Sequence, residues 1–196
     1  MDRIKEFFNG LAEKWDDYQE ATEERKTELL KKAGVKKGQL AIDIACGTGA
    51  ITATLHAITG EKVLAVDISD KMIAVAEKKY RELPWATFIN EDILSLKTEE
   101  KFDIAVIYNA YPHFFEVDKL CKKTAELLKD GGTLAIIHSL SRKELSSHHS
   151  AHAANVSHPI LSPEEEGKKF TDRFTILTAE ESDNHYLLVL KKRDRL

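Results

Sequence analysis

Cysteine is scarce in this chain, and long hydrophobic runs are missing. Only Cys46 and Cys121 are present among 196 residues, and their spacing suggests neither a metal site nor a disulfide framework. No apolar run reaches the roughly 20 residues that span a bilayer, and the first residues lack the hydrophobic region of a signal peptide. We therefore expect a cytoplasmic protein without membrane insertion.

An excess of positive charge is also missing. The chain has 29 Lys and Arg against 33 Asp and Glu, a net charge of −4, which gives no electrostatic reason to expect a nucleic-acid partner. The charged fraction of 32% and the apolar fraction of 42% are typical of a globular protein. Without repeats or low-complexity segments, a chain of this length predicts a single compact domain.

One strand-to-helix turn is the most informative stretch. Residues 40–44 form an almost uninterrupted apolar run, which predicts a strand buried on both faces of a parallel sheet. Cys46-Gly-Thr-Gly49 follows, and a helical pattern then begins at Ile51. Glycines in such a turn let the backbone approach a ligand, and the helix behind it offers unpaired N–H groups.

The residues around this turn restrict the ligand. No Lys follows Gly49, which argues against a phosphate loop, and Thr52 stands where a dinucleotide fingerprint needs its third glycine. Asp43, near the end of the strand, would repel a pyrophosphate but suits a ligand with an ammonium or sulfonium group. The alternative is a tight turn with a purely structural role.

Two further acidic residues follow strands at informative positions. Asp67 ends a strand over residues 62–67, 18 residues beyond the last glycine of the turn. A carboxylate at that position can accept hydrogen bonds from ribose hydroxyls. Asp92 follows a strand over residues 85–90 and, with the backbone of Ile93, is a candidate for binding an exocyclic amine such as that of adenine. Asp92 could equally be a loop carboxylate in water.

The remaining elements complete an α/β pattern. Helices are expected over residues 4–18, 23–33, 51–58, from 70, and 117–128; strands are expected over residues 102–108, 133–138, 174–178 and 185–190, the last two separated by a turn at 180–184. The fold class is therefore a Rossmann-like, doubly wound, mostly parallel sheet of seven strands with a C-terminal antiparallel hairpin. Residues 1–38 would form N-terminal lid helices, and residues 39–196 the main domain.

Histidines gather in two places that face the same edge of the expected sheet. His113 lies in the loop after the fourth strand, close to Tyr108, Asn109 and Tyr111, where a ligand crevice is expected. A second group follows a capping-box pattern at residues 141–144 and contains His148, His149, His152 and His158. His148 and His152 share a helix face and could ligate a metal with His113 or His138. They could also line a substrate pocket or lie in solvent.

The pattern Asp43-x-Ala45-x-Gly47-x-Gly49, together with Asp67, Asp92 and the terminal hairpin, resembles the class I S-adenosyl-L-methionine (SAM)-dependent methyltransferases. Ala45 replaces the first glycine of their motif. Residues 7–15 and the turn are similar to the small-molecule methyltransferases related to the ubiquinone/menaquinone C-methyltransferases. The segment between the fifth and sixth strands is shorter here and rich in histidine, which departs from the quinone enzymes.

The resemblance implies a cofactor site for SAM, with S-adenosyl-L-homocysteine (SAH) as product. By this resemblance the amino-acid portion would be held by Asp43 and by the backbone of Ala45, Cys46, Gly47 and Gly49. Asp67 would bind the ribose, and Asn109 would help to hold the methionine end. The adenine would be held by Ile68, Met72, Asp92 and Ile93.

The implied reaction is methyl transfer to a small-molecule acceptor with an O, S or C nucleophile, by a monomer or homodimer. A histidine suits the role of general base, with His113 preferred and His148 and His149 next; Tyr18 and Trp15 would act as lid residues. Two alternatives remain open: a non-catalytic SAM-binding module, and a metal-assisted methyltransferase using His148 and His152. The acidic balance argues against a macromolecular substrate.

Overall fold

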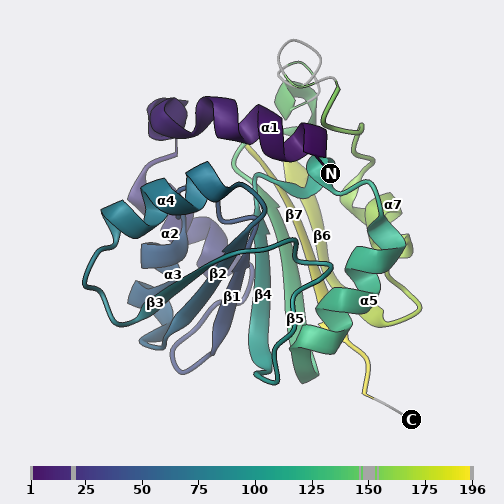
Figure 1. Ribbon diagram of the computed structural model, residues 1–196. Helices are drawn as coiled ribbons and strands as arrows, with labels where there is room; N and C mark the ends of the chain where they lie inside the picture. The colour runs from purple at the N-terminus through teal and green to yellow at the C-terminus, as the bar shows by residue number, and fades with distance from the viewer. Residues whose placement is uncertain (1, 19–20, 146, 148–152, 154, 195–196) are drawn as a thin grey trace.

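A seven-stranded sheet forms the centre of the computed structural model, which describes residues 2–18, 21–145, 147, 153 and 155–194 (Figure 1). The strand order is β3-β2-β1-β4-β5-β7-β6, and β7 is antiparallel to both of its neighbours. The strands are β1 (Ala41–Ile44), β2 (Val63–Asp67), β3 (Ala86–Asn90), β4 (Phe102–Tyr108), β5 (Leu128–His138), β6 (Phe174–Ser182) and β7 (His185–Lys192). The expected Rossmann-like, mostly parallel sheet is confirmed.

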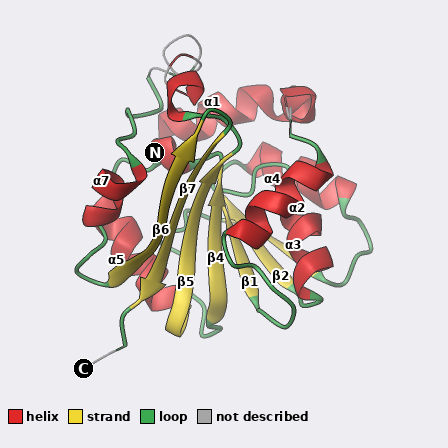
Figure 2. Cartoon of the chain, turned by 180° about the vertical axis from the view of Figure 1, so that it is seen from behind, coloured by secondary structure: helices red, strands yellow, loops and turns green. Residues whose placement is uncertain are grey.

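Helices cover both faces of the sheet and one of its ends. One face carries α2 (Glu23–Lys32), α3 (Thr52–Thr59) and α4 (Asp70–Lys79), and the other carries α5 (Val117–Leu127) and α7 (Pro163–Lys168) (Figure 2). The N-terminal helix α1 (Asp2–Leu11) and the 3-10 helix η1 (Ala12–Tyr18) lie above the sheet, near α4 (Figure 1). A short 3-10 helix, η2 (Tyr111–His113), follows β4. Within the part of the chain described here, no helix is both long and apolar enough to cross a bilayer.

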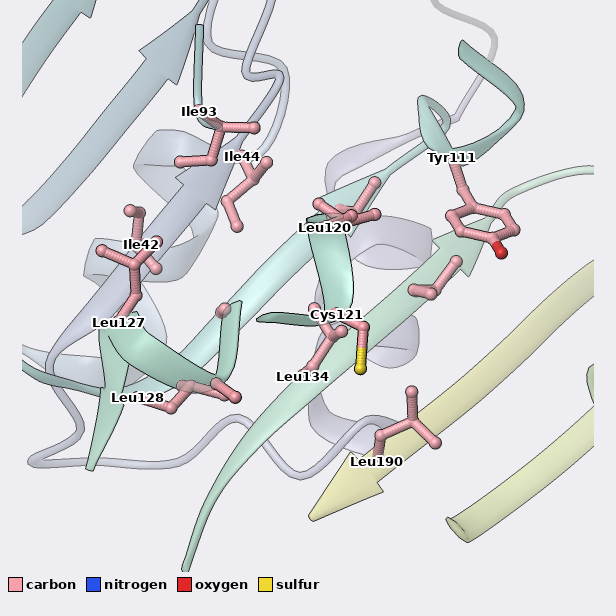
Figure 3. Packing of buried hydrophobic residues seen from close by; sticks show 14 of the residues in the cluster. Ile42, Ile44, Ile93, Tyr111, Leu120, Cys121, Leu127, Leu128, Leu134 and Leu190 are labelled. Carbon is pink, nitrogen blue, oxygen red and sulfur yellow. The ribbon is translucent and has the colours of Figure 1, made fainter. Parts of the chain in front are cut away.

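The central strands are apolar without alternation because both of their faces are buried. On β1, Ile42 and Ile44 belong to the cluster that contains Leu120 of α5 (Figure 3). Ala41 points the other way, into the cluster with Leu55 of α3. Full burial of a Leu or Ile side chain contributes about 1.5–3 kcal/mol, so this double burial holds the strand ends in fixed positions.

Side-chain caps mark the starts of several helices. The Ser69 hydroxyl accepts a hydrogen bond from the Met72 N–H at the start of α4. Ser162 and Glu165 form a capping box at the start of α7. The predicted box at residues 141–144 is also present, with hydrogen bonds between Ser141 and Glu144 and helical residues at 142–145. These short-range patterns were sufficient to place the helix starts.

Several boundaries differ from expectation. Strand β5, expected over residues 133–138, already begins at Leu128. The single helix expected over residues 4–18 ends as α1 at Leu11 and continues as the tighter helix η1. The turn expected at residues 180–184 is shorter, because β6 extends to Ser182. Acidic residues on this edge strand are paired with cations from other elements: Glu180 with Lys32 and Glu181 with Arg142. The acidic stretch at residues 180–183 indicated a loop. In the structure Glu180 and Glu181 instead belong to β6, and each is paired with a cation.

Candidate cofactor and acceptor site

A cavity of about 400 Å³ opens at the C-terminal ends of β1, β2 and β4, beneath α1 and η1. In doubly wound sheets this is the edge at which ligands bind. The residues that line it are Ile4, Phe8, Trp15, Ala45, Cys46, Gly47, Ala50, Val66, Asp67, Ile68, Met72, Glu91, Asp92, Ile93, Leu94, Tyr108, Asn109, Ala110, His113, Phe114, Phe115 and Glu116.

The turn after β1 presents backbone to this cavity. Ala45 and Gly47 line it, and both have left-handed backbone angles, with φ of 57° and 56°. A Cβ on Gly47 would lie 3.4 Å from Nε1 of Trp15, so η1 packs directly against the turn. At position 49, glycine is required by a different contact. Its Cβ would lie 2.5 Å from the Tyr80 ring, whose hydroxyl donates to the Gly49 carbonyl.

Asp67 is held in place by the turn that it faces. Its Oδ2 accepts the Gly47 N–H and its Oδ1 accepts the Ser69 N–H, each at 2.8 Å. Burial raises the pKa of this carboxyl above its ordinary value of 3.8, although both backbone hydrogen bonds act in the opposite direction. The side chain lines the cavity with only 8% of the residue exposed. The result is a rigid acceptor at the end of β2.

Asp43 lies one layer deeper than the resemblance implied. Its residue is 1% exposed and is not among those that line the cavity; its Oδ2 accepts the Thr52 hydroxyl at 2.7 Å. Burial, with a smaller contribution from the charge of Asp67, raises the pKa of Asp43 to about 7. Asp43 therefore supports the start of α3 beneath the cavity floor.

The loops after β2 and β3, together with α4, supply an apolar slot bordered by a carboxylate. Ile68, Met72 and Ile93 line the cavity together with Asp92. Oδ1 of Asp92 accepts the Leu94 N–H at 3.0 Å, which orients this side chain. All four of these residues were expected to hold an adenine, and the structure brings them together.

Asn109 connects two strand ends. It has a φ of 54° and lines the cavity, but its amide is engaged with Ser139. Nδ2 donates to the Ser139 hydroxyl at 2.9 Å, and Oδ1 accepts the Ser139 N–H at 2.8 Å. The side chain therefore links the end of β4 to the end of β5, and Asn109 borders the cavity at that junction.

The opposite wall is aromatic. Phe8 makes edge-to-face contacts with Trp15, at 5.4 Å between ring centroids, and with His113, at 4.9 Å. The Nδ1 of His113 lies 2.8 Å from the Val156 carbonyl oxygen. A carbonyl only accepts, so Nδ1 carries the hydrogen, and Nε2 is the basic nitrogen of the neutral ring. Phe114, Phe115 and Glu116 extend this wall towards α5.

Several expected residues lie elsewhere. Tyr18 does not line the cavity: the residue is 58% exposed, although its ring contacts Trp15. Tyr111 is fully buried and donates its hydroxyl to Glu166. His148, His149 and His152 lie outside the described residues. No group of three His, Cys, Asp or Glu that could hold a metal occurs among the residues that the structure does describe.

Other lining residues were missed as site residues. Ile4 and Phe8 belong to the apolar face already visible at residues 4–18, and that signal could have placed them above the sheet. Glu91 adjoins Asp92 after the same strand, whereas Leu94 and Glu116 gave no local signal, because only the strand order brings their loops to one cavity.

The groups present suit a nucleoside with a cationic substituent. Asp67 is an oriented acceptor for hydroxyls, the Ile68–Ile93 slot suits a flat apolar base, and the backbone of residues 45–47 borders the same space. The sheet with its antiparallel β7, the glycine turn after β1 and the acidic residue at the end of β2 is the arrangement that the resemblance to the class I SAM-dependent methyltransferases implied.

Comparison with known proteins also finds methyltransferases. Residues 41–132 match a family described as a methyltransferase domain. Sterol 24-C-methyltransferase of Saccharomyces cerevisiae is 30% identical over 112 residues, which are 55% of this chain and 29% of that protein. The ubiquinone/menaquinone biosynthesis C-methyltransferase of Salmonella arizonae is 27% identical over 149 residues, 69% of this chain and 59% of that protein. The chain thus spans about 30–60% of the length of these relatives.

The fold is also that of a solved methyltransferase. The N-methyltransferase NodS of Bradyrhizobium japonicum, crystallised with SAH, superposes with a TM-score of 0.72 at 16% identity over 98% of both chains. Residues 41–132 are therefore similar to a methyltransferase domain, and the chain has the fold of a solved methyltransferase.

Proposed function

We propose that this protein binds SAM in the cavity and transfers its methyl group to a small-molecule acceptor. The observation that carries the proposal is the placement of Asp67, which is oriented by the Gly47 and Ser69 N–H groups at the edge of a cavity large enough for a nucleoside. Asp67 would hold the ribose hydroxyls, Ile68, Met72, Asp92 and Ile93 the adenine, and the backbone of residues 45–47 the amino-acid portion. Bound SAM supplies a methyl group activated by the positive sulfonium.

The chain's own contribution is to orient the acceptor and exclude water. The aromatic wall of Phe8, Trp15 and Phe114 offers an apolar surface for the acceptor beside the cofactor site. An acceptor that reacts through a hydroxyl, a thiol or an acidic carbon must lose a proton. His113 suits this role because its Nδ1–H is held by Val156, which leaves Nε2 as the basic nitrogen.

Cofactor binding is tested first, by calorimetric titration of the protein with SAH. We expect one site per chain with a dissociation constant in the micromolar range or tighter. Absence of binding up to millimolar SAH would refute the proposed function. Binding of SAH without methyl transfer to any phenol, thiol or quinone in an acceptor screen would instead favour a non-catalytic SAM-binding module.

The role of His113 is tested by the variant His113→Gln. For an acceptor found in the screen, we expect kcat to fall by about 10²–10⁴-fold, with SAH affinity unchanged. His158→Gln is the matched control, because the His158 ring contacts the Phe114 and Pro159 carbonyls near the site and does not line the cavity. A His113 variant that keeps full kcat would exclude this residue as the base.

A further inference from the structure

The charges around the cavity are all of one sign. Among the described residues that line it, Asp67, Glu91, Asp92 and Glu116 are acidic, and none is Lys or Arg. Asp67 and Asp92 lie where the ribose and adenine would be held, so a bound SAM, with its own positive charge, faces these carboxylates. Glu116 stands apart from them, beside Phe115 at the start of α5.

Nearby cations offset this charge only in part. Lys119 pairs with Glu116, but its side chain is 67% exposed and that of Glu116 is 49% exposed. Exposed pairs of this kind are strongly screened by water. Lys5 pairs with Asp70 and Lys79 with Asp16, and none of these four side chains lines the cavity. Among the described residues that line the cavity, an anion would therefore meet carboxylates and no Lys or Arg side chain.

The wall next to Glu116 is built from rings. Phe114 and Phe115 precede Glu116 directly, and Phe8 and Trp15 lie across from them in α1 and η1. Phe115 is 55% exposed, which is unusual for so large an apolar side chain. Faces of aromatic rings attract cations, and a carboxylate beside them adds to that attraction. Rings of an acceptor would also pack well against such a wall.

Building on the proposed function, we propose that the acceptor is a ring-containing, apolar molecule that is neutral or carries an ammonium group. An acceptor with a carboxylate or phosphate group is rejected by the charge of the cavity. Glu116 is the residue that sets this preference at the acceptor end. In the transfer itself, the methyl carbon leaves the sulfonium sulfur, bonds to the acceptor nucleophile, and the acceptor proton passes to His113.

The test uses the full chain saturated with SAH and three ligands of one shape: 2-phenylethylammonium, 3-phenylpropanamide and 3-phenylpropanoate. We expect the ammonium and the amide to bind at least about tenfold more tightly than the carboxylate, measured by ligand-observed NMR at low salt. Raising the salt concentration should narrow the difference, because screening weakens the repulsion.

The variant Glu116→Gln should raise the affinity for 3-phenylpropanoate by about threefold or more and leave that for the amide unchanged. The Glu116 side chain makes no capping hydrogen bond at the start of α5, so the helix tolerates this change. Asp118→Asn is the control: the residue is exposed, lies two residues further along α5, does not line the cavity, and should change nothing.

The outcomes separate this inference from the proposed function. A protein that does not bind SAH refutes the proposed function itself. A protein that binds SAH but binds the carboxylate as tightly as the ammonium, or none of the three ligands below 10 mM, overturns only the inference about the acceptor.

Discussion

The two sides of the cavity are held by different kinds of interaction. The floor consists of the strand ends and the turn, with Asp43, Asp67 and residues 45–49. It is fixed by buried hydrogen bonds such as those from Gly47 and Ser69 to Asp67. The roof consists of α1 and η1, which rest on aromatic edges and on polar contacts that are exposed or partly buried: Lys5 with Asp70, Asn9 with Ser69, and Asp16 with Thr48 and Lys79.

The carboxyl groups of the two sides respond oppositely to their surroundings. On the floor, burial raises the pKa of Asp43 to about 7 and raises that of Asp67. Under the roof, hydrogen bonds from Lys5 and Asn9 lower the pKa of Asp70 to about 2. Burial opposes a similar change at Asp16, but the hydrogen bonds from Thr48 and Lys79 prevail and lower its pKa.

This difference indicates a division of labour. Under the proposed function, the buried floor would hold the cofactor. The roof is held by pairs that are individually weak, and we expect it to separate from the sheet when the acceptor binds. Substitutions on the floor should therefore lower cofactor affinity or the stability of the fold. Substitutions under the roof should change both only slightly.

The largest effect is expected for Asp67→Asn. The amide can accept only one of the two N–H groups that the carboxylate accepts, and it loses charge-assisted hydrogen bonds worth about 1.5–3 kcal/mol each. We expect the affinity for SAH to fall by about 100-fold, measured by calorimetry. Asp70→Asn, under the roof, should change it less than threefold. Equal losses in both variants would contradict the division between floor and roof.

Gly49→Ala should be the most destabilising change on the floor. It forces an alanine to a φ of +81° and places its Cβ 2.5 Å from the Tyr80 ring. Gly60→Ala is the matched control, with a φ of +72° and nothing within 4 Å of the added Cβ. Denaturant unfolding should show a loss of about 3 kcal/mol for the first and about 1 kcal/mol for the second. Similar losses of stability in both variants would show that contact with the Tyr80 ring is not the reason for glycine at position 49.

Asp43→Asn tests the buried charge. The folded pKa of about 7 lies above the ordinary 3.8, so Asp43 favours folding most below pH 4, and this contribution is lost as the pH rises through 7. The asparagine carries no charge and can still accept the Thr52 hydroxyl. Between pH 4 and pH 8, the free energy of unfolding of the variant, measured with denaturant, should therefore rise relative to that of the natural protein by about 4 kcal/mol. If the difference in the free energy of unfolding between the two proteins is the same at both pH values, Asp43 is charged in the folded protein at both.

Asp16→Asn should have the smallest effect. The side chains of Asp16 and Lys79 are 46% and 38% exposed, so their pair contributes less than about 1 kcal/mol to folding. We expect a small decrease in Tm by calorimetry, SAH affinity within about twofold, and a changed KM for the acceptor. A large loss of SAH affinity would mean that the roof also holds the cofactor.

Much of the floor could be predicted from the sequence, because its signals are local. The apolar run before Cys46 gave β1, and the spacing from the glycine turn gave Asp67 as the residue at the end of β2. Both the Ser69 and the Ser162 helix starts follow from residues within three positions of each other. The family resemblance then placed Ile68, Met72, Asp92 and Ile93, which the structure brings together along the cavity.

The roof and the details of the turn could not be predicted in this way. Tyr18 was expected to act at the site and is exposed outside it, whereas Phe8, ten residues earlier in the same apolar pattern, contacts His113. Gly49 was expected to approach the cofactor, yet its missing Cβ makes room for Tyr80. The side toward which each residue points depends on partners more than 30 positions away.

The amino-acid sequence by itself determined the order of the strands and helices, the glycine turn and the acidic residues that follow the strands, because hydrophobic periodicity and capping act within a few residues. Only the tertiary structure decided that Asp43 lies beneath the floor, that Val156 orients the His113 ring, and that acidic and aromatic residues line the cavity beside α5. These three features depend on loops that are distant in the sequence and that the strand order brings to one edge of the sheet. Local sequence patterns do not predict contacts between such loops.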